Sequence, residues 1–150
     1  MGYNAVIPGR LYMGSDPSGA YLSVDTLVLT AMEHQSNIYS GPKTILHVPL
    51  NDDGSPITQN EVRLALHASK DVARRVRRGE KVLVTCHMGK NRSGLVSALT
   101  LVNLGASAST AIRTVRAARG QAALRNRDFF DLVHLHGSAY GRQPQAMLCT

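Results

Sequence analysis

The stretch at residues 81–104, KVLVTCHMGKNRSGLVSALTLVNL, decides the fold. Its beginning, residues 81–85, is apolar and rich in β-branched side chains with almost no polar alternation, which predicts a buried central strand. Its end, residues 93–104, is apolar on nearly every side, which predicts a buried helix. A short loop, residues 86–92, joins the two. A buried strand that leads directly into a buried helix is typical of a domain with a largely parallel sheet.

The flanking sequence adds further elements of both kinds. Thr58 followed by Glu61 is a capping-box pattern, and it predicts a helix over residues 58–78 that ends at Gly79. Apolar patterning places further strands at residues 11–13, 26–29 and 44–50, and further helices at 108–119 and 128–136. We therefore expect a single α/β domain over residues 1–150, with a central, mostly parallel sheet flanked by helices. Its core covers about residues 6–136, and a tail begins at about residue 137.

Composition excludes several classes of protein. The chain has 150 residues, of which 43% are hydrophobic, and it contains no apolar run long enough for a membrane span. The first ten residues lack the basic start and apolar stretch of a signal peptide. We therefore expect a cytoplasmic protein. The sequence contains no signal for an oligomeric state.

The net charge of +7 favours anionic partners, which include phosphorylated substrates, nucleic acid and anionic membranes. The arginines are concentrated in two groups, at residues 74–78 and 113–119. The favoured interpretation is that these are the solvated faces of two helices; a surface that attracts phosphate or nucleic acid is the alternative.

The two cysteines, Cys86 and Cys149, do not form a disulfide framework, and a bond between them under oxidation has no support in the sequence. The six histidines show no zinc-like spacing. We therefore expect no metal and no cofactor.

The loop from Cys86 to Ser93 carries the chemistry. Its backbone N–H groups point inward at the start of a helix, which makes a site for an anion. Arg92 can donate a two-pronged hydrogen bond to phosphate oxygens, and Gly89 lets the backbone curl. The same positive field favours the thiolate of Cys86, which then lies in line for attack on a bound phosphoryl group.

This loop resembles the Cys-x5-Arg-Ser signature of the protein tyrosine phosphatase superfamily. Residues 7–14, IPGRLYMG, resemble the opening strand of dual-specificity phosphatases, and the similarity extends over about residues 6–136, closest to the small atypical members. The resemblance implies a phosphatase with Cys86 as nucleophile and Arg92 as phosphate clamp. The residues that it implies for substrate binding are His87, Met88, Gly89, Lys90, Asn91 and Ser93.

The general acid of these enzymes lies on a loop about thirty residues before the cysteine, and here the segment at residues 47–53 fits that loop. Asp52 has the better spacing, and Asp53 is the alternative; the remaining aspartate would stabilise the turn. The implied mechanism forms a cysteinyl-phosphate, and Asp52 then activates the water that releases phosphate. The Ser93 hydroxyl can hydrogen-bond the sulfur. Thr85 stands where the family usually has histidine, so we expect the thiolate to be less favoured than is usual.

Several substrates stay open at this point. Phosphotyrosine and phosphoserine or phosphothreonine proteins come first. Lys90 resembles a residue of inositol-lipid phosphatases, and Asn91 resembles one of RNA 5′-triphosphatases, so RNA ends and phosphoinositides are alternatives. A catalytically weak phosphate-binding module and a sulfurtransferase or arsenate reductase are the competing classes. The latter usually need resolving cysteines, and Cys149 is poorly placed for that role.

Overall fold

The structure is a computed structural model, and it describes residues 3–140. Its elements follow the order β1 (Tyr3–Ile7), β2 (Leu11–Gly14), β3 (Thr26–Ala31), η1 (Met32–His34), β4 (Thr44–Leu50), α1 (Gln59–Arg77), β5 (Val82–Thr85), α2 (Arg92–Asn103), α3 (Ala108–Arg119) and α4 (Arg127–Tyr140). Cys149 and most of the predicted tail lie outside the described residues. The last helix continues four residues beyond its predicted end at residue 136.

The five strands form one sheet in the order β1-β2-β5-β3-β4. The four strands β2, β5, β3 and β4 run parallel, and β1 pairs with β2 in the antiparallel direction at one edge. The prediction of a mostly parallel sheet is therefore confirmed. Because β5 is the middle strand, the loop that follows it opens at the centre of the sheet's carboxyl edge.

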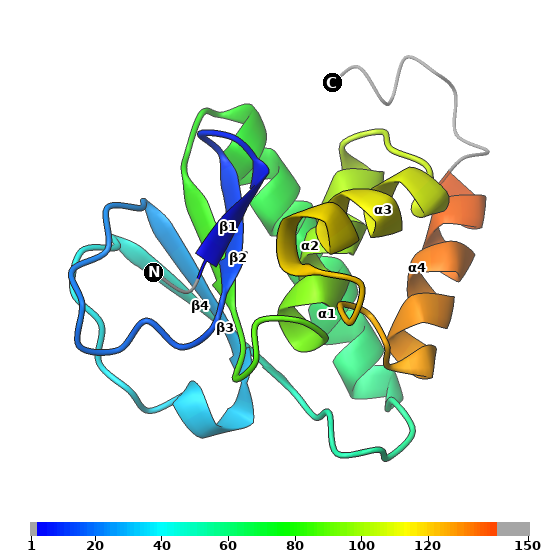
Figure 1. The fold of residues 1–150 in the computed structure, drawn as a ribbon, viewed down its shortest axis with the longest axis horizontal. Helices are drawn as coiled ribbons and strands as arrows, with labels where there is room; N and C mark the ends of the chain where they lie inside the picture. Colours follow the sequence, from blue (N-terminus) through cyan, green and yellow to red (C-terminus); the bar gives the residue numbers. More distant parts are fainter. Residues whose placement is uncertain (1–2, 141–150) are drawn as a thin grey trace.

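The helices cover one face of the sheet, as Figure 1 shows with the sheet on the left and the helices on the right. Helix α2 lies at the centre of this layer and packs against α1, α3, α4 and the strands below it. Nearly all of its residues are buried, as its apolar composition predicts.

The structure confirms the expected α/β fold, with the helices on one face of the sheet and loops on the opposite face. Alternate side chains of the central strands point there, and Leu27, Leu29 and Leu83 form a second, smaller core with Leu22. Leu22 comes from the segment between β2 and β3, and Tyr39, which packs against this core, comes from the segment between η1 and β4. These two loops bury the second face that a parallel sheet must hide from water.

Helix α1 begins as the sequence predicts, with a capping box in which Glu61 N donates to the Thr58 side chain and Thr58 N donates to Glu61. The arginines at its end have structural partners. Arg77 Nη2 donates to the carbonyl of Asn103 at 2.8 Å, and so ties α1 to the end of α2. Among the described residues, no helix has the length and apolar character needed to cross a membrane.

Candidate active site

The loop that carries the predicted nucleophile begins where β5 ends. Cys86 follows Thr85 directly, and its backbone N–H donates to the carbonyl of Gly14 at the end of β2. Helix α2 starts at Arg92 and has no acidic side chain in its first turn, so the positive end of its dipole is not neutralised from within the helix. Cys86 therefore lies at the carboxyl edge of the parallel strands and near a helix start, where α/β proteins bind anions.

The sulfur of Cys86 has a hydroxyl partner beneath it. Cys86 is 2% exposed, and its Sγ donates to Oγ of the fully buried Ser93 at 3.3 Å. When the sulfur is a thiolate, the same contact reverses, because a thiolate can only accept and the hydroxyl can donate. Ser93 is thus placed to stabilise a negative sulfur, as the sequence predicts.

Gly89 allows the loop to approach the strand next to it. Its φ is +68°, and a Cβ at this position would lie 2.6 Å from the carbonyl carbon of Gly14. Because that neighbour is backbone, it cannot move aside, so only glycine fits here.

An arginine from α3 braces the same loop. Arg119 donates from Nε to the carbonyl of Gly89 at 2.9 Å and from Nη2 to that of Met88 at 3.3 Å. Its Nη1 donates to Asn4 Oδ1 on β1 at 2.7 Å. The interpretation of residues 113–119 as a solvated helix face is therefore wrong for Arg119, which holds the loop to β1.

Arg92 is directed into the site and is held there by a residue that the sequence did not indicate. Its Nη2 donates to Glu33 Oε1 at 3.3 Å and its Nη1 to the carbonyl of Leu50 at 3.4 Å, while Nε is buried with no partner among the described residues. The pKa of Glu33 is lowered, first by the hydrogen bond from its own backbone N–H and then by Arg92. Glu33 lies 59 positions before Arg92 in no recognisable motif, so sequence alone had no signal for it.

The two candidate acids have different surroundings. Asp52 accepts hydrogen bonds from Nδ2 of Asn91 at 3.1 Å and from Nδ2 of Asn126 at 2.8 Å. Asp53 is exposed and accepts from the backbone N–H of Ser55 at 2.9 Å, which closes a turn. Its hydrogen bonds with Ser55 hold the pKa of Asp53 below its usual value. The structure thus places Asp52 in the site and Asp53 in the turn.

Asn91 connects the segment at residues 47–53, called the acid loop below, to the start of α4. Its Oδ1 accepts from the backbone N–H groups of Arg125 at 2.8 Å and Asn126 at 3.2 Å, while its amide nitrogen donates to Asp52. One side chain in the signature loop therefore positions both the proposed acid and the segment that carries Asn126.

Thr85 forms hydrogen bonds within the sheet. Its hydroxyl donates to the carbonyl of Val28 at 3.1 Å, and its own carbonyl accepts from the Thr30 hydroxyl at 2.7 Å. These bonds tie β5 to β3 just before the loop. The single hydrogen bond that Thr85 can donate therefore goes to the neighbouring strand.

These elements meet around a pocket of about 170 Å³. Its lining comes from the acid loop, the signature loop and the segment before α4: Asp52, Cys86, Met88, Lys90, Asn91, Arg92, Ala122 and Arg125. The predicted nucleophile, clamp and acid are thus brought together. Ser93 lies beneath the sulfur, and the Gly89 backbone faces β2.

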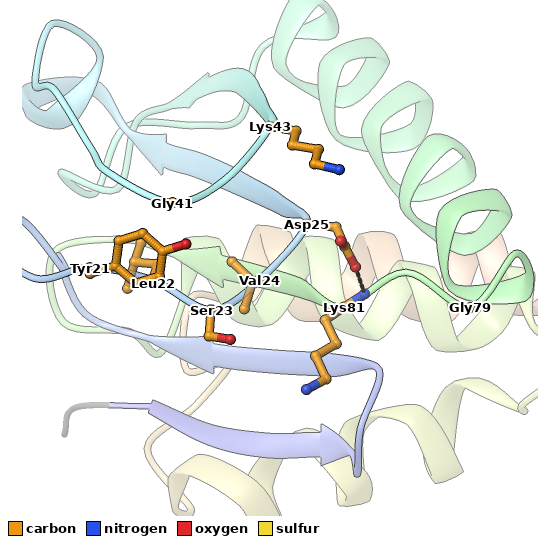
Figure 2. A pocket seen from close by; sticks show the side chains of 9 residues that line it. All are labelled: Tyr21, Leu22, Ser23, Val24, Asp25, Gly41, Lys43, Gly79 and Lys81. Atoms are coloured by element: carbon orange, nitrogen blue, oxygen red, sulfur yellow. Dashed lines mark hydrogen bonds between the residues drawn. The ribbon is translucent and has the colours of Figure 1, made fainter.

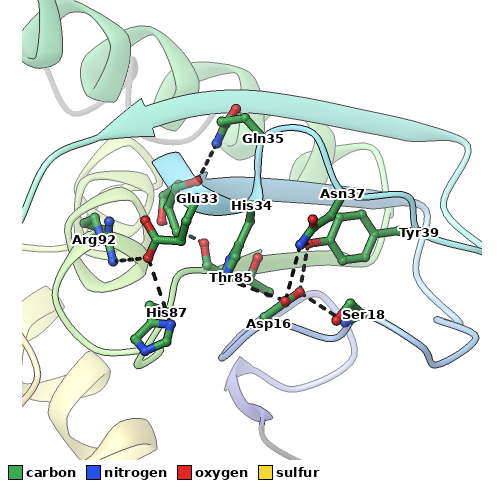
Figure 3. A network of polar contacts seen from close by, with 12 residues as sticks. Asp16, Ser18, Glu33, His34, Gln35, Asn37, Tyr39, Thr85, His87 and Arg92 are labelled. Atoms are coloured by element: carbon green, nitrogen blue, oxygen red, sulfur yellow. Dashed lines mark hydrogen bonds and ion pairs between the residues drawn. The ribbon is translucent and has the colours of Figure 1, made fainter.

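His87 is not among the residues that line this pocket. Its side chain is 64% exposed, and its Nδ1 lies 3.9 Å from Glu33 Oε1. Figure 3 marks this contact with a dashed line. His34, on η1 beside Glu33, completes a group whose potential ligand atoms all lie within 4.8 Å of one another. Chain spacing did not reveal this group, because residues 34 and 87 meet only in the fold.

A larger pocket, of about 360 Å³, lies away from this chemistry. Figure 2 shows it where the parallel strands start, with Lys43 and Asp25 on its walls and the Asp25 carboxylate accepting from Lys81 N at 2.8 Å. None of the residues that line it belongs to the signature loop or to the segment of Asp52, so its size does not make it the candidate active site.

Comparison with known proteins agrees with this geometry. Residues 51–114 match the model of the tyrosine phosphatase family, and this span contains Asp52, Cys86 and Arg92. No curated protein matches the sequence.

Solved structures share the fold. Human DUSP28 aligns with a TM-score of 0.79 at 24% identity over 94% of this chain and 96% of its own. The OH1 protein of Orf virus, described as a tyrosine phosphatase with triple substrate specificity, aligns at 0.68 and 23% identity over 92% and 88%. PTPMT1 in complex with PI(5)P aligns at 0.72 and 14% identity over 93% and 96%. At these identities the likeness establishes the fold.

Proposed function

We propose that this chain, a member of the protein tyrosine phosphatase superfamily, hydrolyses phosphate monoesters through a cysteinyl-phosphate on Cys86. One observation carries the proposal: Asp52, from the loop after β4, lines the same small pocket as Cys86 and Arg92 of the signature loop. A nucleophile, an anion clamp and a proton donor are the three groups that the reaction requires.

The first step transfers the phosphoryl group to sulfur. The thiolate of Cys86 attacks phosphorus, an S–P bond forms, and the bond from phosphorus to the ester oxygen breaks. Protonated Asp52 donates its proton to that oxygen, so the product leaves as a neutral alcohol or phenol. Arg92 and the loop N–H groups stabilise the charge on the remaining phosphate oxygens.

The second step returns the enzyme to its starting state. The Asp52 carboxylate removes a proton from water, whose oxygen attacks phosphorus while the S–P bond breaks. Inorganic phosphate leaves, and the sulfur departs as a thiolate that accepts a hydrogen bond from Ser93, 3.3 Å away. Asp52 is protonated again, so it alternates between acid and base in one cycle. This chemistry needs no cofactor.

Arg92 must turn from its protein partners to the substrate. Its contact with Glu33 is an ion pair in which the Glu33 side chain is 51% exposed, and such pairs contribute only about 0–1 kcal/mol. A phosphate dianion that accepts a bidentate hydrogen bond from the guanidinium is a stronger partner. Glu33 therefore holds Arg92 in place between turnovers and gives it up to substrate at little cost.

We propose phosphorylated proteins as the first substrate class, on phosphotyrosine, phosphoserine or phosphothreonine. The pocket rim supports a second class, substrates with more than one phosphate such as phosphoinositides or RNA 5′ ends. Lys90 and Arg125 line the pocket, and neither has an ion pair among the described residues. Two uncompensated cations beside a phosphate clamp favour additional negative charge.

We also propose a cytosolic location. A catalytic cysteine works as a thiolate, and a reducing compartment keeps it from disulfide formation and oxidation.

The test is phosphate release by wild type and Cys86→Ser. The panel is p-nitrophenyl phosphate, a phosphotyrosine peptide, a phosphothreonine peptide, a phosphoinositide and triphosphate-ended RNA. We expect activity in wild type and none in the variant, and the ranking of substrates decides between the two classes. If no substrate is cleaved while phosphopeptide binding persists, the chain is a binding module and the proposal fails.

A further inference from the structure

We propose that Glu33, His34 and His87 form a site for one divalent transition-metal ion of the zinc class, beside the signature loop. The carboxylate oxygen and the two imidazole nitrogens that they offer lie within 4.8 Å of one another. Figure 3 shows the three side chains side by side, with Glu33 and His34 on η1 and His87 on the loop. The site goes beyond the proposed phosphatase reaction, which uses none of these side chains as a reacting group.

The buried histidine is the strongest evidence for a ligand. His34 is 5% exposed, and its Nδ1 has no hydrogen-bond partner among the described residues. Leaving a buried polar group unsatisfied costs about 1–3 kcal/mol. A metal ion bound at this nitrogen would remove that cost, since neutral imidazole is a preferred zinc ligand.

The other nitrogen of His34 has the carboxylate partner that is common behind metal-binding histidines. Its Nε2 lies 3.6 Å from Asp16 Oδ2, and Asp16 in turn accepts from the Tyr39 hydroxyl at 2.8 Å. Such a carboxylate fixes the ring and leaves the opposite nitrogen free to bind metal.

The other two proposed ligands, Glu33 and His87, lie close enough together to bind the same ion. Four-coordinate zinc bonds nitrogen and oxygen at about 2.0–2.2 Å, which places neighbouring ligand atoms about 3.4 Å apart. Glu33 Oε1 and His87 Nδ1 are already 3.9 Å apart, and both side chains are more than half exposed. Both can therefore make the small remaining movement toward His34, and Glu33 gives up its weak contact with Arg92 to do so.

The backbone beneath the site is held firmly. The side-chain amide of Gln35 donates to the carbonyls of Leu29 at 3.0 Å and Ala31 at 2.8 Å, which anchors η1 to the end of β3. Two imidazoles with one carboxylate suit zinc, cobalt or nickel, whereas magnesium and calcium prefer oxygen ligands throughout. A fourth coordination position remains for water.

The experiment is a cobalt(II) titration of tag-free protein that carries Cys86→Ser and Cys149→Ser, so that no thiol can act as a ligand. We expect visible ligand-field absorption that saturates at one equivalent and is displaced by zinc. Its readout is spectroscopic, so it is independent of whether the phosphatase proposal holds.

Variants assign the ligands. Glu33→Gln and His87→Ala, at exposed positions that are safe for folding, should each weaken cobalt affinity at least tenfold. Asp16→Asn should weaken it about 10–100-fold, as is usual for a second-layer partner. His67→Ala, an exposed histidine on α1, is the matched control and should change nothing. Unchanged affinity in Glu33→Gln and His87→Ala, or no saturable absorption, would overturn the proposal.

Discussion

Replacing Asn91 with alanine tests whether this side chain positions Asp52, the proposed general acid. The change removes the hydrogen bonds to the backbone N–H groups of Arg125 and Asn126 and the one donated to the Asp52 carboxylate. Each neutral bond contributes about 1 kcal/mol, and a bond to a charged group about 1.5–3 kcal/mol. In a half-exposed site, hydrogen bonds to water compensate for part of the lost hydrogen bonds. We therefore expect the free energy of unfolding to fall by about 2 kcal/mol. For a chain of this length that lowers Tm by about 4–8 °C.

The effect on activity depends on the leaving group. Asp52 keeps its bond from Asn126 Nδ2 at 2.8 Å, but the segment that carries Asn126 has lost its own anchor. A displacement near 1 Å costs about 10²-fold where the proton transfer matters. We therefore expect kcat to fall about 10–10²-fold on a phosphoserine peptide, whose alcohol needs a proton to leave. On p-nitrophenyl phosphate, whose leaving group is already stable as an anion, kcat should change little.

The assay measures kcat for both substrates alongside thermal unfolding. Asn60→Ala, an exposed amide on α1 that does not line the pocket, is the control and should match wild type in both. Equal losses of kcat on the two substrates, or an unchanged Tm, would refute the positioning role of Asn91.

Three further predictions follow from the same geometry. Asp52→Asn should lower kcat on poor leaving groups by about 10²–10⁴, whereas Asp53→Asn should stay near wild type, since its carboxylate only closes a turn. The folded-state pKa of Asp16 is lowered, so its ionised form stabilises the fold at any pH above the pKa of the unfolded chain, about 3.9. This contribution is lost as the pH falls through the folded-state pKa. The free energy of unfolding of Asp16→Asn, measured by urea titration, should therefore lie below wild type at pH 7 and converge with it in acid. Glu33→Gln should tighten inhibition by inorganic phosphate by at most about fivefold, because Arg92 loses only a weak surface partner.

Each of these predictions has an outcome that contradicts it. A large loss in Asp53→Asn with normal kcat in Asp52→Asn would exchange the roles of the two aspartates. A stability difference for Asp16→Asn that persists unchanged at low pH would show that its carboxylate acts through shape and not charge. Weaker phosphate inhibition in Glu33→Gln would mean that Glu33 orients Arg92 for substrate.

The elements that the sequence predicted correctly have local causes. The bounds of α3 match the prediction, and the start of α1 follows from the capping box of Thr58 and Glu61. The missed elements depend on tertiary contacts. Strand β1 has two exposed residues in its middle and so shows no apolar pattern, and η1 is held by the Gln35 side chain. Helix coverage of one sheet face could not be predicted either, because both faces of β3 and β5 are equally apolar.

The residues of the candidate site also fall into those that a local motif predicts and those that depend on tertiary contacts. Cys86 and Arg92 belong to one contiguous motif, and spacing favoured Asp52 over Asp53. Glu33 and Arg119 act on the loop from far away in sequence, and a single arginine on a helix gives no sign of whether it faces water or a backbone carbonyl. Their roles appear only once the loop is folded against β1 and η1.

The brace from Arg119 has a consequence for how the protein is made. Its hydrogen bond to Asn4 spans 115 positions, and the same guanidinium holds the carbonyls of residues 88 and 89. During synthesis, Cys86 leaves the ribosome before Arg119 does, so the proposed nucleophile exists for a time without the hydrogen bonds that brace its loop. A nascent or truncated chain that ends before α3 would carry a cysteine with no formed anion site around it. The proposed catalytic loop is therefore braced only after α3 has packed against β1.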